Sequence, residues 1–194
     1  MNRIISFPHV GDYSYFIKPF LEKVTLEKVK IAPPITKKTV EIGSKLSPDS
    51  VCMPFKYNIG CYVEALEEGA NILFQFGGGC RYGNYAELQK TILSDLGYEF
   101  EFYEFIKKGK TSFNYIYKTF KSINSELTRM TLLKELILVF LKIMIFDKSE
   151  HYTRKKIEKD EGEFKKLKYK FINDLCNERN IFKIFKIKHH YKLK

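Results

Sequence analysis

Short apolar runs alternate with amphipathic segments through the first half of the chain. The apolar runs have the length and composition of strands, and they cover residues 3–7, 28–32, 70–76 and 98–106. The segments between them place apolar residues at helical spacing and predict helices at residues 13–24, 36–43, 52–68 and 85–96. Strands separated by helices are typical of a parallel, three-layered α/β unit. We therefore expect a Rossmann-like parallel sheet of about four strands with flanking helices.

Capping residues mark the ends of the predicted helices. Thr36 is expected to cap the helix that it begins, and Pro54 falls in a first helical turn, where proline is tolerated. Gly69 is expected to end the helix at 52–68, and Gly97 is expected to end the helix at 85–96. The helix at 52–68 should bury the apolar residues Ile59, Val63 and Leu66. The helix at 85–96 should place on one face the residues Leu88, Ile92 and Leu96.

The pattern changes after residue 106, where the strand signals fade. Helices are predicted at residues 115–123, 131–146 and 152–176. The run 131–146 is almost entirely apolar, but it is too short and too charged to cross a membrane, so we expect a helix packed against another surface. Residues 181–188 alternate like a strand. We therefore expect an α/β domain over 1–106, a Lys-rich helical region over 107–180, and a tail or the start of a missing second domain over 181–194.

Length and composition fit a globular chain. The 194 residues are 44% hydrophobic and 15% aromatic, which is enough to form a core in one domain with a helical appendage. The first apolar run has only a strand's length, so no secretory leader is indicated and a cytoplasmic location is expected. In that reducing compartment, the four cysteines are expected to be free, redox-active or metal-bound.

The net charge of +11 belongs to one half of the chain. Up to Ile106, 11 Lys and Arg residues stand against 13 Asp and Glu residues, or −2, and the remainder carries 23 against 10, or +13. Nearly all of this excess is Lys, whereas Arg supplies the bidentate contacts of base and phosphate recognition. A solvated Lys-rich helical face is the simpler interpretation, and neither nucleic acid nor a membrane is the expected partner.

Two cysteines are predicted where a parallel α/β fold presents its ligands. Cys52 opens a helix, where unpaired N–H groups and the helix dipole lower the pKa of a thiol. Cys80 follows a buried strand, and ligands of open parallel sheets bind beyond the carboxyl ends of the strands. We therefore predict a metal or iron–sulfur site with Cys52 and Cys80 as ligands. By spacing alone, cysteines this far apart in sequence also suit buried structural thiols.

Other residues near this edge are candidates for ligand contact. They are His9, Lys56, Gly77, Gly78, Gly79 and Arg81. The glycine run lets a backbone approach a ligand closely, or forms an ordinary strand-to-helix turn. Lys56 and Arg81 can balance an anionic cluster or hold a phosphate of coenzyme A, or they are solvated surface charges. His9 is a possible ligand, but it also suits a hydrogen-bonded loop. Further candidate ligands are Cys61, which more simply faces a helix interior, and Cys176. No phosphate-binding loop or HExxH motif is found, so ATP hydrolysis is not expected.

The run CMPFK…GGGCRYG and its flanking segments resemble the 2-hydroxyacyl-CoA dehydratase family, most closely its CoA-protein activase or dehydratase-activator-related branch. The resemblance covers about residues 1–106. It implies a [4Fe–4S] cluster held by cysteines of two similar domains, an ATP-dependent activator protein that delivers an electron, and an acyl-CoA substrate. Cys52 and Cys80 match the family's first-domain cysteines, whereas Cys61 matches none of its ligands. The chain departs from the family by lacking the second domain, as a truncated or partial member would.

Two functions from different classes are therefore predicted. The first is an iron–sulfur redox protein that acts as a dehydratase-type lyase or as its electron-transfer component. Its ligand set would be completed by Cys176 or by a partner chain, because iron–sulfur clusters prefer four thiolates. The alternative is a non-catalytic α/β interaction module that binds a partner chain, or a second copy of itself, through the helix at 131–146. The two differ in whether iron and sulfide bind, and in whether Cys52→Ser or Cys80→Ser removes them.

Overall fold

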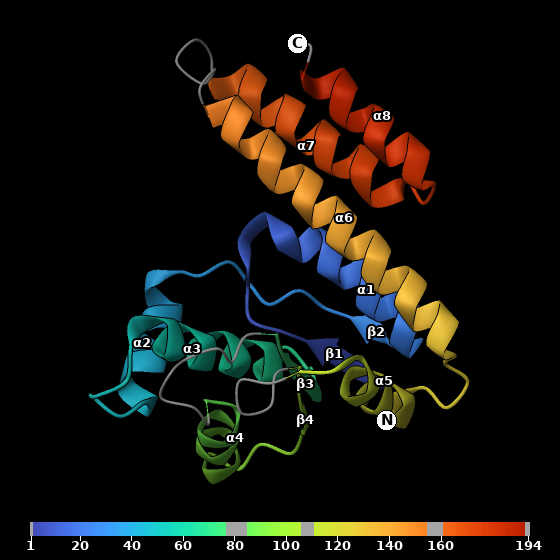
Figure 1. The fold of residues 1–194 in the computed structure, drawn as a ribbon. Coiled ribbons are helices and arrows are strands. Elements are labelled where there is room, and N and C mark those ends of the chain that lie inside the picture. The colour runs from blue at the N-terminus through green and yellow to red at the C-terminus, as the bar shows by residue number, and fades with distance from the viewer. Residues whose placement is uncertain (1, 77–84, 106–110, 155–160, 193–194) are drawn as a thin grey trace.

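The computed structural model describes residues 2–76, 85–105, 111–154 and 161–192, and Figure 1 shows the arrangement of its elements. In chain order these are β1 (Ile4–Ser6), the 3-10 turn η1 (Gly11–Tyr13), α1 (Ser14–Thr25), β2 (Lys28–Val29), α2 (Lys37–Leu46), α3 (Met53–Glu67), β3 (Ile72–Gln75), α4 (Tyr85–Asp95), β4 (Glu101–Glu104), α5 (Phe113–Ile123), α6 (Arg129–Arg154), α7 (Glu161–Asn177) and α8 (Ile181–Lys192). The four strands pair in parallel in the order β2-β1-β3-β4. The expected α/β fold with a C-terminal helical region is confirmed.

Helices cover both faces of the sheet. Helices α1 and α5 and the first turns of α6 pack on one face, and α3 and α4 pack on the other. All four residues of β3 are buried, as is usual for a central strand of a parallel sheet. Ile72 and Phe74 point to the α1 and α5 side, and Leu73 points to the α3 and α4 side. The core is therefore divided into two layers by the sheet.

Helix α5 shares the core of the strands, although it follows the expected boundary near residue 106. Its Phe120 is fully buried, with its ring centroid 5.7 Å from that of Phe74 and 5.1 Å from that of Phe105. A third ring, of Phe20 on α1, lies 5.7 Å away. Aromatic rings at these separations contribute packing energy beyond their buried area. The α/β unit therefore extends through α5.

Helices α2 and α3 cross with their backbones in contact. Thr36 caps α2 as expected, and it exchanges hydrogen bonds with Thr39 in a capping box. At the crossing, a β-carbon on Gly43 would overlap the carbonyl oxygen of Lys56, and a β-carbon on Gly60 would overlap that of Thr39. The Thr39 hydroxyl also donates a buried hydrogen bond of 2.8 Å to Glu64. Two glycines therefore permit the contact, and a polar pair orients it.

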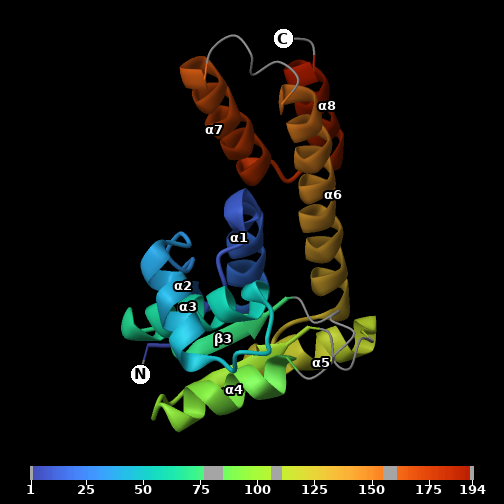
Figure 2. The same ribbon diagram turned by 90° about the vertical axis from the view of Figure 1, so that its left-hand side faces the viewer.

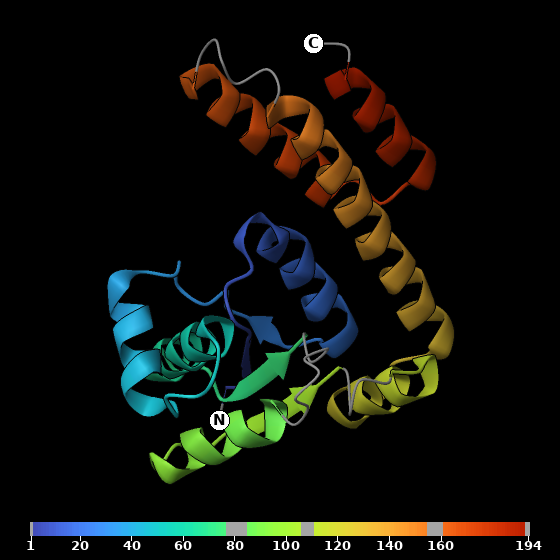
Figure 3. The same ribbon diagram turned by 60° about the vertical axis from the view of Figure 1, so that its left-hand side comes forward.

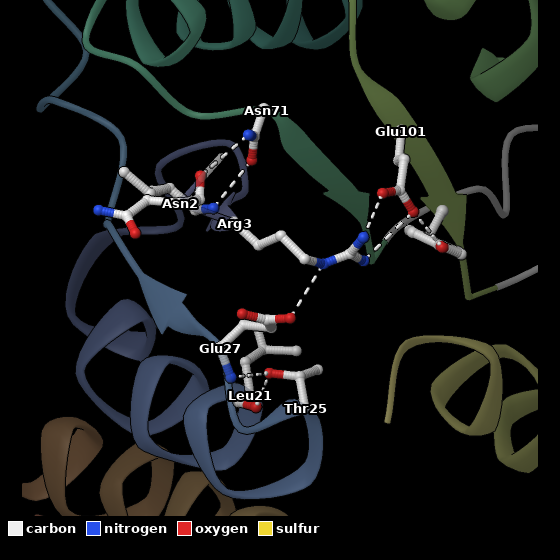
Figure 4. A network of polar contacts seen from close by, with 9 residues as sticks. Asn2, Arg3, Leu21, Thr25, Glu27, Asn71 and Glu101 are labelled. Carbon is white, nitrogen blue, oxygen red and sulfur yellow. Dashed lines mark hydrogen bonds and ion pairs between the residues drawn. The ribbon is translucent and has the colours of Figure 1, made fainter. Parts of the chain in front are cut away.

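A polar network joins all four strands at the amino edge of the sheet (Figure 4). The guanidinium of Arg3 lies 2.9 Å from the carboxylate of Glu27, which precedes β2, and 2.7 Å from that of Glu101 in β4. Asn71, which precedes β3, accepts a hydrogen bond from the amide of Ile4 and donates one to the carbonyl of Asn2. These hydrogen bonds and ion pairs connect the loops at this edge to one another.

The helical region extends away from the sheet. Figures 2 and 3 show α6 passing α1 and continuing to α7 and α8. Phe146 on α6 packs against Phe16 of α1, with 5.4 Å between ring centroids, and Asp147 accepts a hydrogen bond from Tyr13. Asp12 forms an ion pair with Lys168 of α7. Within the described residues, no helix combines the length and apolar composition that a membrane crossing requires.

The predicted strand at 181–188 is wrong, because these residues lie in α8. The oxygen of the Asn180 side chain accepts hydrogen bonds from the amides of Phe182 and Lys183 and caps the helix. The run reads IFKIFKIK, so its apolar residues recur every three positions, which places Ile184 and Ile187 on the face that packs in the helical core. Tertiary packing therefore selects the helical period.

Two smaller expectations are also corrected. Helix α4 buries Ala86, Gln89 and Leu93, whereas Leu88 and Leu96 of the expected face are 37% and 44% exposed. The helix expected at 152–176 begins at Glu161 instead, because α6 continues to Arg154. The predicted ends at Gly69 and Gly97 are confirmed, and both glycines have positive φ.

Candidate functional site

The candidate site lies at the carboxyl edge of the sheet. Helices α3 and α4 lie on the same face, and each begins at this edge, because each leads to a following parallel strand. The chain passes from β1 outward to β2, and β3 then lies on the opposite side of β1. In open α/β sheets, ligands bind at such a reversal of strand order, beyond the carboxyl ends of the strands. Cys52 and Tyr85, which stand at the starts of α3 and α4, lie at this edge.

Cys52 occupies the N-cap position of α3 and its side chain is exposed. Its Sγ atom lies 2.5 Å from the hydroxyl of Tyr85. The Tyr85 hydrogen bond, followed by the backbone N–H of Phe55, lowers the pKa of Cys52 below its ordinary value. Both groups stabilise the thiolate, as the positive end of a helix dipole also does. The structure thus supports the prediction that Cys52 favours the thiolate form, and it adds Tyr85 as the main cause.

Tyr85 is a site residue that the sequence analysis did not identify. Its ring packs on that of Phe55, with the centroids 5.0 Å apart, and Phe55 is buried in the first turn of α3. The aromatic contact therefore holds the starts of α3 and α4 together, and it directs the hydroxyl to Cys52. No sequence signal reveals this pair, because 33 positions separate the two residues.

Three buried polar side chains lie on the same side of the sheet. Ser6 and Gln75 end β1 and β3, and both point to the α3 and α4 side, since alternate strand residues share a face. Gln89 lies on the buried face of α4. Each is at most 3% exposed, and polar atoms of each have no hydrogen-bond partner in the part of the chain that the structure describes. Buried polar groups are nearly always paired in proteins, so these unpaired groups distinguish this layer from the rest of the core.

Cys61 and Cys52 are not close enough to share a cluster. They are nine positions apart on α3, which corresponds to about 13 Å along the helix axis. Cys61 is fully buried, and burial raises the pKa of its thiol to about 11. A protonated, enclosed thiol is a poor ligand or nucleophile. The simpler prediction for Cys61, a buried position on the helix, describes it correctly.

Cys176 belongs to the helical region. Its thiol lies 3.3 Å from the carbonyl oxygen of Tyr15, and it packs with the cluster formed by α1, α6, α7 and α8. Burial raises the pKa of Cys176, and the neighbouring Lys142 partly opposes this effect. The structure therefore gives Cys176 a packing role beside α1, among residues of a different cluster from those around Cys52.

The remaining predicted contact residues divide into two groups. His9 lies in the loop after β1, where its Nδ1 atom accepts a hydrogen bond of 3.1 Å from the amide of Gly11. Lys56 is half-buried in the first turn of α3, and its amide donates to the carbonyl of Cys52. The predicted residues that lie outside the described part of the chain are Cys80, Gly77, Gly78, Gly79 and Arg81.

The described residues fit an iron–sulfur cluster only in part. They contain no group of three His, Cys, Asp or Glu side chains placed to hold a metal ion. At the carboxyl edge of the sheet they supply one exposed thiol, Cys52, whereas clusters prefer four thiolate ligands. The described residues at this edge therefore supply one of the four ligands that a cluster prefers.

A hollow of about 530 Å³ lies beside the free edge of β4, between α4 and α5. Its lining combines cationic Lys90 and Lys118 with acidic Glu87 and Glu104. No cysteine or histidine is among the lining residues, so this hollow is chemically different from the surroundings of Cys52.

Fold and site together define a parallel α/β protein with an activated, exposed thiol at the carboxyl edge of its sheet. Comparisons with protein-family models, with curated proteins and with solved structures found no match for this chain. The function must therefore be argued from the site itself.

Proposed function

We propose that this chain supplies part of an iron–sulfur redox site, with Cys52 as a thiolate ligand. The observation that carries the proposal is the pairing of an exposed N-cap cysteine with Tyr85, which lowers the pKa of the thiol. Metal ligation requires the thiolate, so the same pairing favours ligand formation near neutral pH. A bound cluster would supply one-electron chemistry. The Tyr85 hydroxyl would hold the Cys52 sulfur in place and donate a hydrogen bond to it.

The proposal includes a second ligand in this chain and further ligands from another. Cys80 is the second ligand in this chain, as the resemblance to the 2-hydroxyacyl-CoA dehydratase family implies. A second-domain partner chain completes the set, because Cys61 is buried within α3 and Cys176 is half-buried in the helical region. We further propose a cytoplasmic location, an ATP-dependent activator as electron donor and an acyl-CoA as substrate, all on the strength of this resemblance.

Anaerobic reconstitution with iron, sulfide and excess dithiothreitol, whose thiolates stand in for the ligands of the partner chain, tests the proposal. We expect bound iron and acid-labile sulfide in the wild-type chain, and their loss in Cys52→Ser and in Cys80→Ser. The matched control is Cys176→Ser, which removes a thiol from the helical region and should leave the metal content unchanged. A chain that stays metal-free after reconstitution, or that retains its metal in Cys52→Ser, would overturn the proposal.

The Tyr85→Phe variant tests the activation of the thiol independently of any cluster. Without the hydroxyl, the pKa of Cys52 should rise, so alkylation by iodoacetamide near pH 7 should slow several-fold. The rate is measured for the Cys52 peptide by mass spectrometry as a function of pH. Because the ring and its contact with Phe55 remain, the fold should be unaffected. An unchanged pH profile would remove the physical basis for a ligand role.

A non-catalytic interaction module is the second candidate function. The observation that favours it is a line of exposed apolar side chains on α6, where Met130 is 75% and Phe140 is 60% exposed. Contiguous exposed apolar surface marks binding sites in proteins. Under this alternative, the chain binds a partner without iron or sulfide, and Cys52→Ser does not change that binding.

A further inference from the structure

The two edges of the sheet differ in how they are protected against further pairing. At one edge, β2 has only two residues, Lys28 and Val29, and Pro33 follows it closely. At the other edge, β4 has four residues, and no lysine, proline or bulge interrupts the described segment 98–105. Short strands, lysines and prolines are common means of keeping a sheet edge from pairing with another chain. The edge at β4 lacks them.

Backbone groups at this edge point away from the sheet. The amides of Glu101 and Phe105 donate to backbone carbonyls on the β3 side. Successive residues of a strand direct their backbone groups to opposite sides, so the carbonyl of Phe100 and both backbone groups of Phe102 face outward. Among the described residues, neither Phe100 nor Phe102 has a backbone hydrogen bond on this side. Outward N–H and C=O groups of this kind are a template for a further strand.

The hollow of about 530 Å³ lies along this edge. Its lining includes Phe102 and Tyr103 of β4, and the walls come from α4 and α5, which Figure 1 shows on either side of β4. Volumes of about 300–1,000 Å³ are typical of ligand sites. A strand added to β4 would lie about 4.8 Å from it, between the two helical walls. The hollow therefore has the form of a groove for an extended chain.

The two walls of the groove differ in charge. Helix α5 contains two lysines and no acidic residue, and its Lys118 lines the groove without an ion pair among the described residues. The hydroxyls of Thr119 and Ser122 on this wall donate to carbonyls of their own helix. On the α4 wall, Glu87 and Lys90 carry opposite charges. An occupant that complements the groove therefore has acidic side chains on the α5 side.

We propose that this groove binds an extended, acidic segment of a partner protein as a further strand beside β4. Side chains of an added strand alternate between its two faces, so acidic residues at every second position would all face Lys118. Main-chain hydrogen bonds to β4 supply affinity, and Lys118 supplies selectivity. A single extended segment fits between the walls, whereas a second copy paired edge to edge would bring its own α4 and α5 against those of the first.

A pair of labelled hexapeptides tests the binding. In one, glutamate alternates with valine, which favours extended structure, and in the other lysine replaces each glutamate. Fluorescence anisotropy at about 50 mM salt, where surface charges are weakly screened, measures their affinities. Because the contact is short, the glutamate peptide should bind with a dissociation constant on the order of 100 µM, and the lysine peptide should bind about 10-fold more weakly.

Two variants with the same change in net charge separate the groove from general attraction to a basic protein. Lys118→Glu should weaken binding of the glutamate peptide about 10-fold and strengthen binding of the lysine peptide. Lys134→Glu changes an exposed lysine on α6 and should alter either affinity less than about two-fold. Both lysines are exposed on helices, so circular dichroism should match the wild type. Equal effects of the two substitutions would overturn the proposal.

N-methylation of the glutamate peptide tests the main-chain pairing. Methyl groups on the valine amides and on the glutamate amides remove donors from opposite edges of an extended peptide. One pattern should abolish binding and the other should retain it. Loss with the valine pattern indicates an antiparallel strand, and loss with the glutamate pattern indicates a parallel one.

Three outcomes would overturn the proposal. They are equal binding of the two methylated peptides, no binding of the unmethylated glutamate peptide up to about 1 mM, and a dimer of the chain that this peptide dissociates in sedimentation velocity. The last would show that a second copy occupies the groove. None of these outcomes bears on the proposed cluster, because no cysteine lines the groove.

Discussion

The α/β unit and the helical region bury their apolar side chains to different extents. In the α/β unit, the exposed large apolar residues lie singly on loops and helix ends, such as Leu26, Met53 and Leu96. Such scattered residues are normal on protein surfaces. On α6 they form one continuous line instead, over residues 130–144. The comparison shows that the α/β unit, together with the first turns of α6, encloses its core, whereas α6 also has a second apolar face that its own chain does not cover within the described residues.

The two regions also differ in how their helices meet. Helices α2 and α3 approach closely enough that Gly43 and Gly60 contact the opposite backbone. In the helical region, large side chains such as Phe146, Phe171 and Leu175 fill the space between helices. Packing through glycines tolerates little change in volume, and packing through long side chains can adjust by changes of rotamer. We therefore expect the α/β unit to respond to substitution as a whole and the helical region to respond locally.

The largest expected effect comes from Phe120→Ala in the α/β unit. Removing a fully buried ring that contacts three others should lower the free energy of unfolding by about 3–5 kcal/mol. The matched change in the helical region is Ile184→Ala, which also empties a fully buried position. It should detach α8 while the sheet stays protected. Urea unfolding and amide hydrogen exchange measure the two effects. Equal loss of protection in the strands for both variants would contradict the distinction.

Gly43→Ala should have the next largest effect. The new β-carbon would overlap the carbonyl of Lys56, so α2 must move away from α3, at a cost of about 2–3 kcal/mol or more. Lys45→Ala on the exposed side of the same helix is the control, and it should change stability by less than about 0.5 kcal/mol. Chemical denaturation of the two variants provides the comparison. A Gly43→Ala variant as stable as its control would show that the two helices can separate freely.

The smallest effect should appear only at alkaline pH, through Cys61. Its folded-state pKa of about 11 lies above the ordinary value of 9.0, so the folded chain keeps a proton that the unfolded chain loses. The resulting stabilisation is fully present below about pH 9 and is lost as the pH rises through about 11. It amounts to roughly 2–3 kcal/mol at most.

Cys61→Ala lacks this titration, so the difference in unfolding free energy between wild type and variant should shrink over that pH range. The comparison cancels other groups that titrate there, such as Lys142, whose pKa is lowered by burial. Urea midpoints at several pH values from 7 upward test this expectation. Parallel profiles for the two proteins would mean that the thiol is not buried as the structure places it.

Much of the fold follows from local patterns. The four strands, the cap at Thr36 and the helix ends at Gly69 and Gly97 were all predicted from hydrophobic periodicity and turn chemistry, because these features depend on residues close in sequence. The strand predicted at 181–188 was wrong because its apolar residues recur every three positions, which is closer to the period of a helix than to the alternation of a strand. The cap at Asn180 is a local signal that could have identified the helix.

The candidate site was predictable only in part. The position of Cys52 at a helix start and at the carboxyl edge followed from the order of the predicted elements. Its partner Tyr85 did not, since a contact between the starts of two helices depends on how those helices pack. Gln75 and Gln89 were missed for the same reason, although a glutamine within the apolar run 72–76 is a visible exception to the pattern. Cys80 stays a prediction, because it lies outside the described residues.

By itself, the sequence determined the α/β class, the order of the strands and helices through α7, and the division between a weakly acidic first half and a basic second half. These properties depend on composition and on the spacing of apolar residues, which recur about every two residues in strands and about every three and a half residues in helices. Both can be read from a short segment of sequence. Only the tertiary structure decided that α5 completes the core of the sheet, that Cys52 meets Tyr85 while Cys61 is enclosed, and that α6 keeps one apolar face uncovered. Each of these depends on contacts between segments distant in sequence, and burial is a property of the whole packed chain.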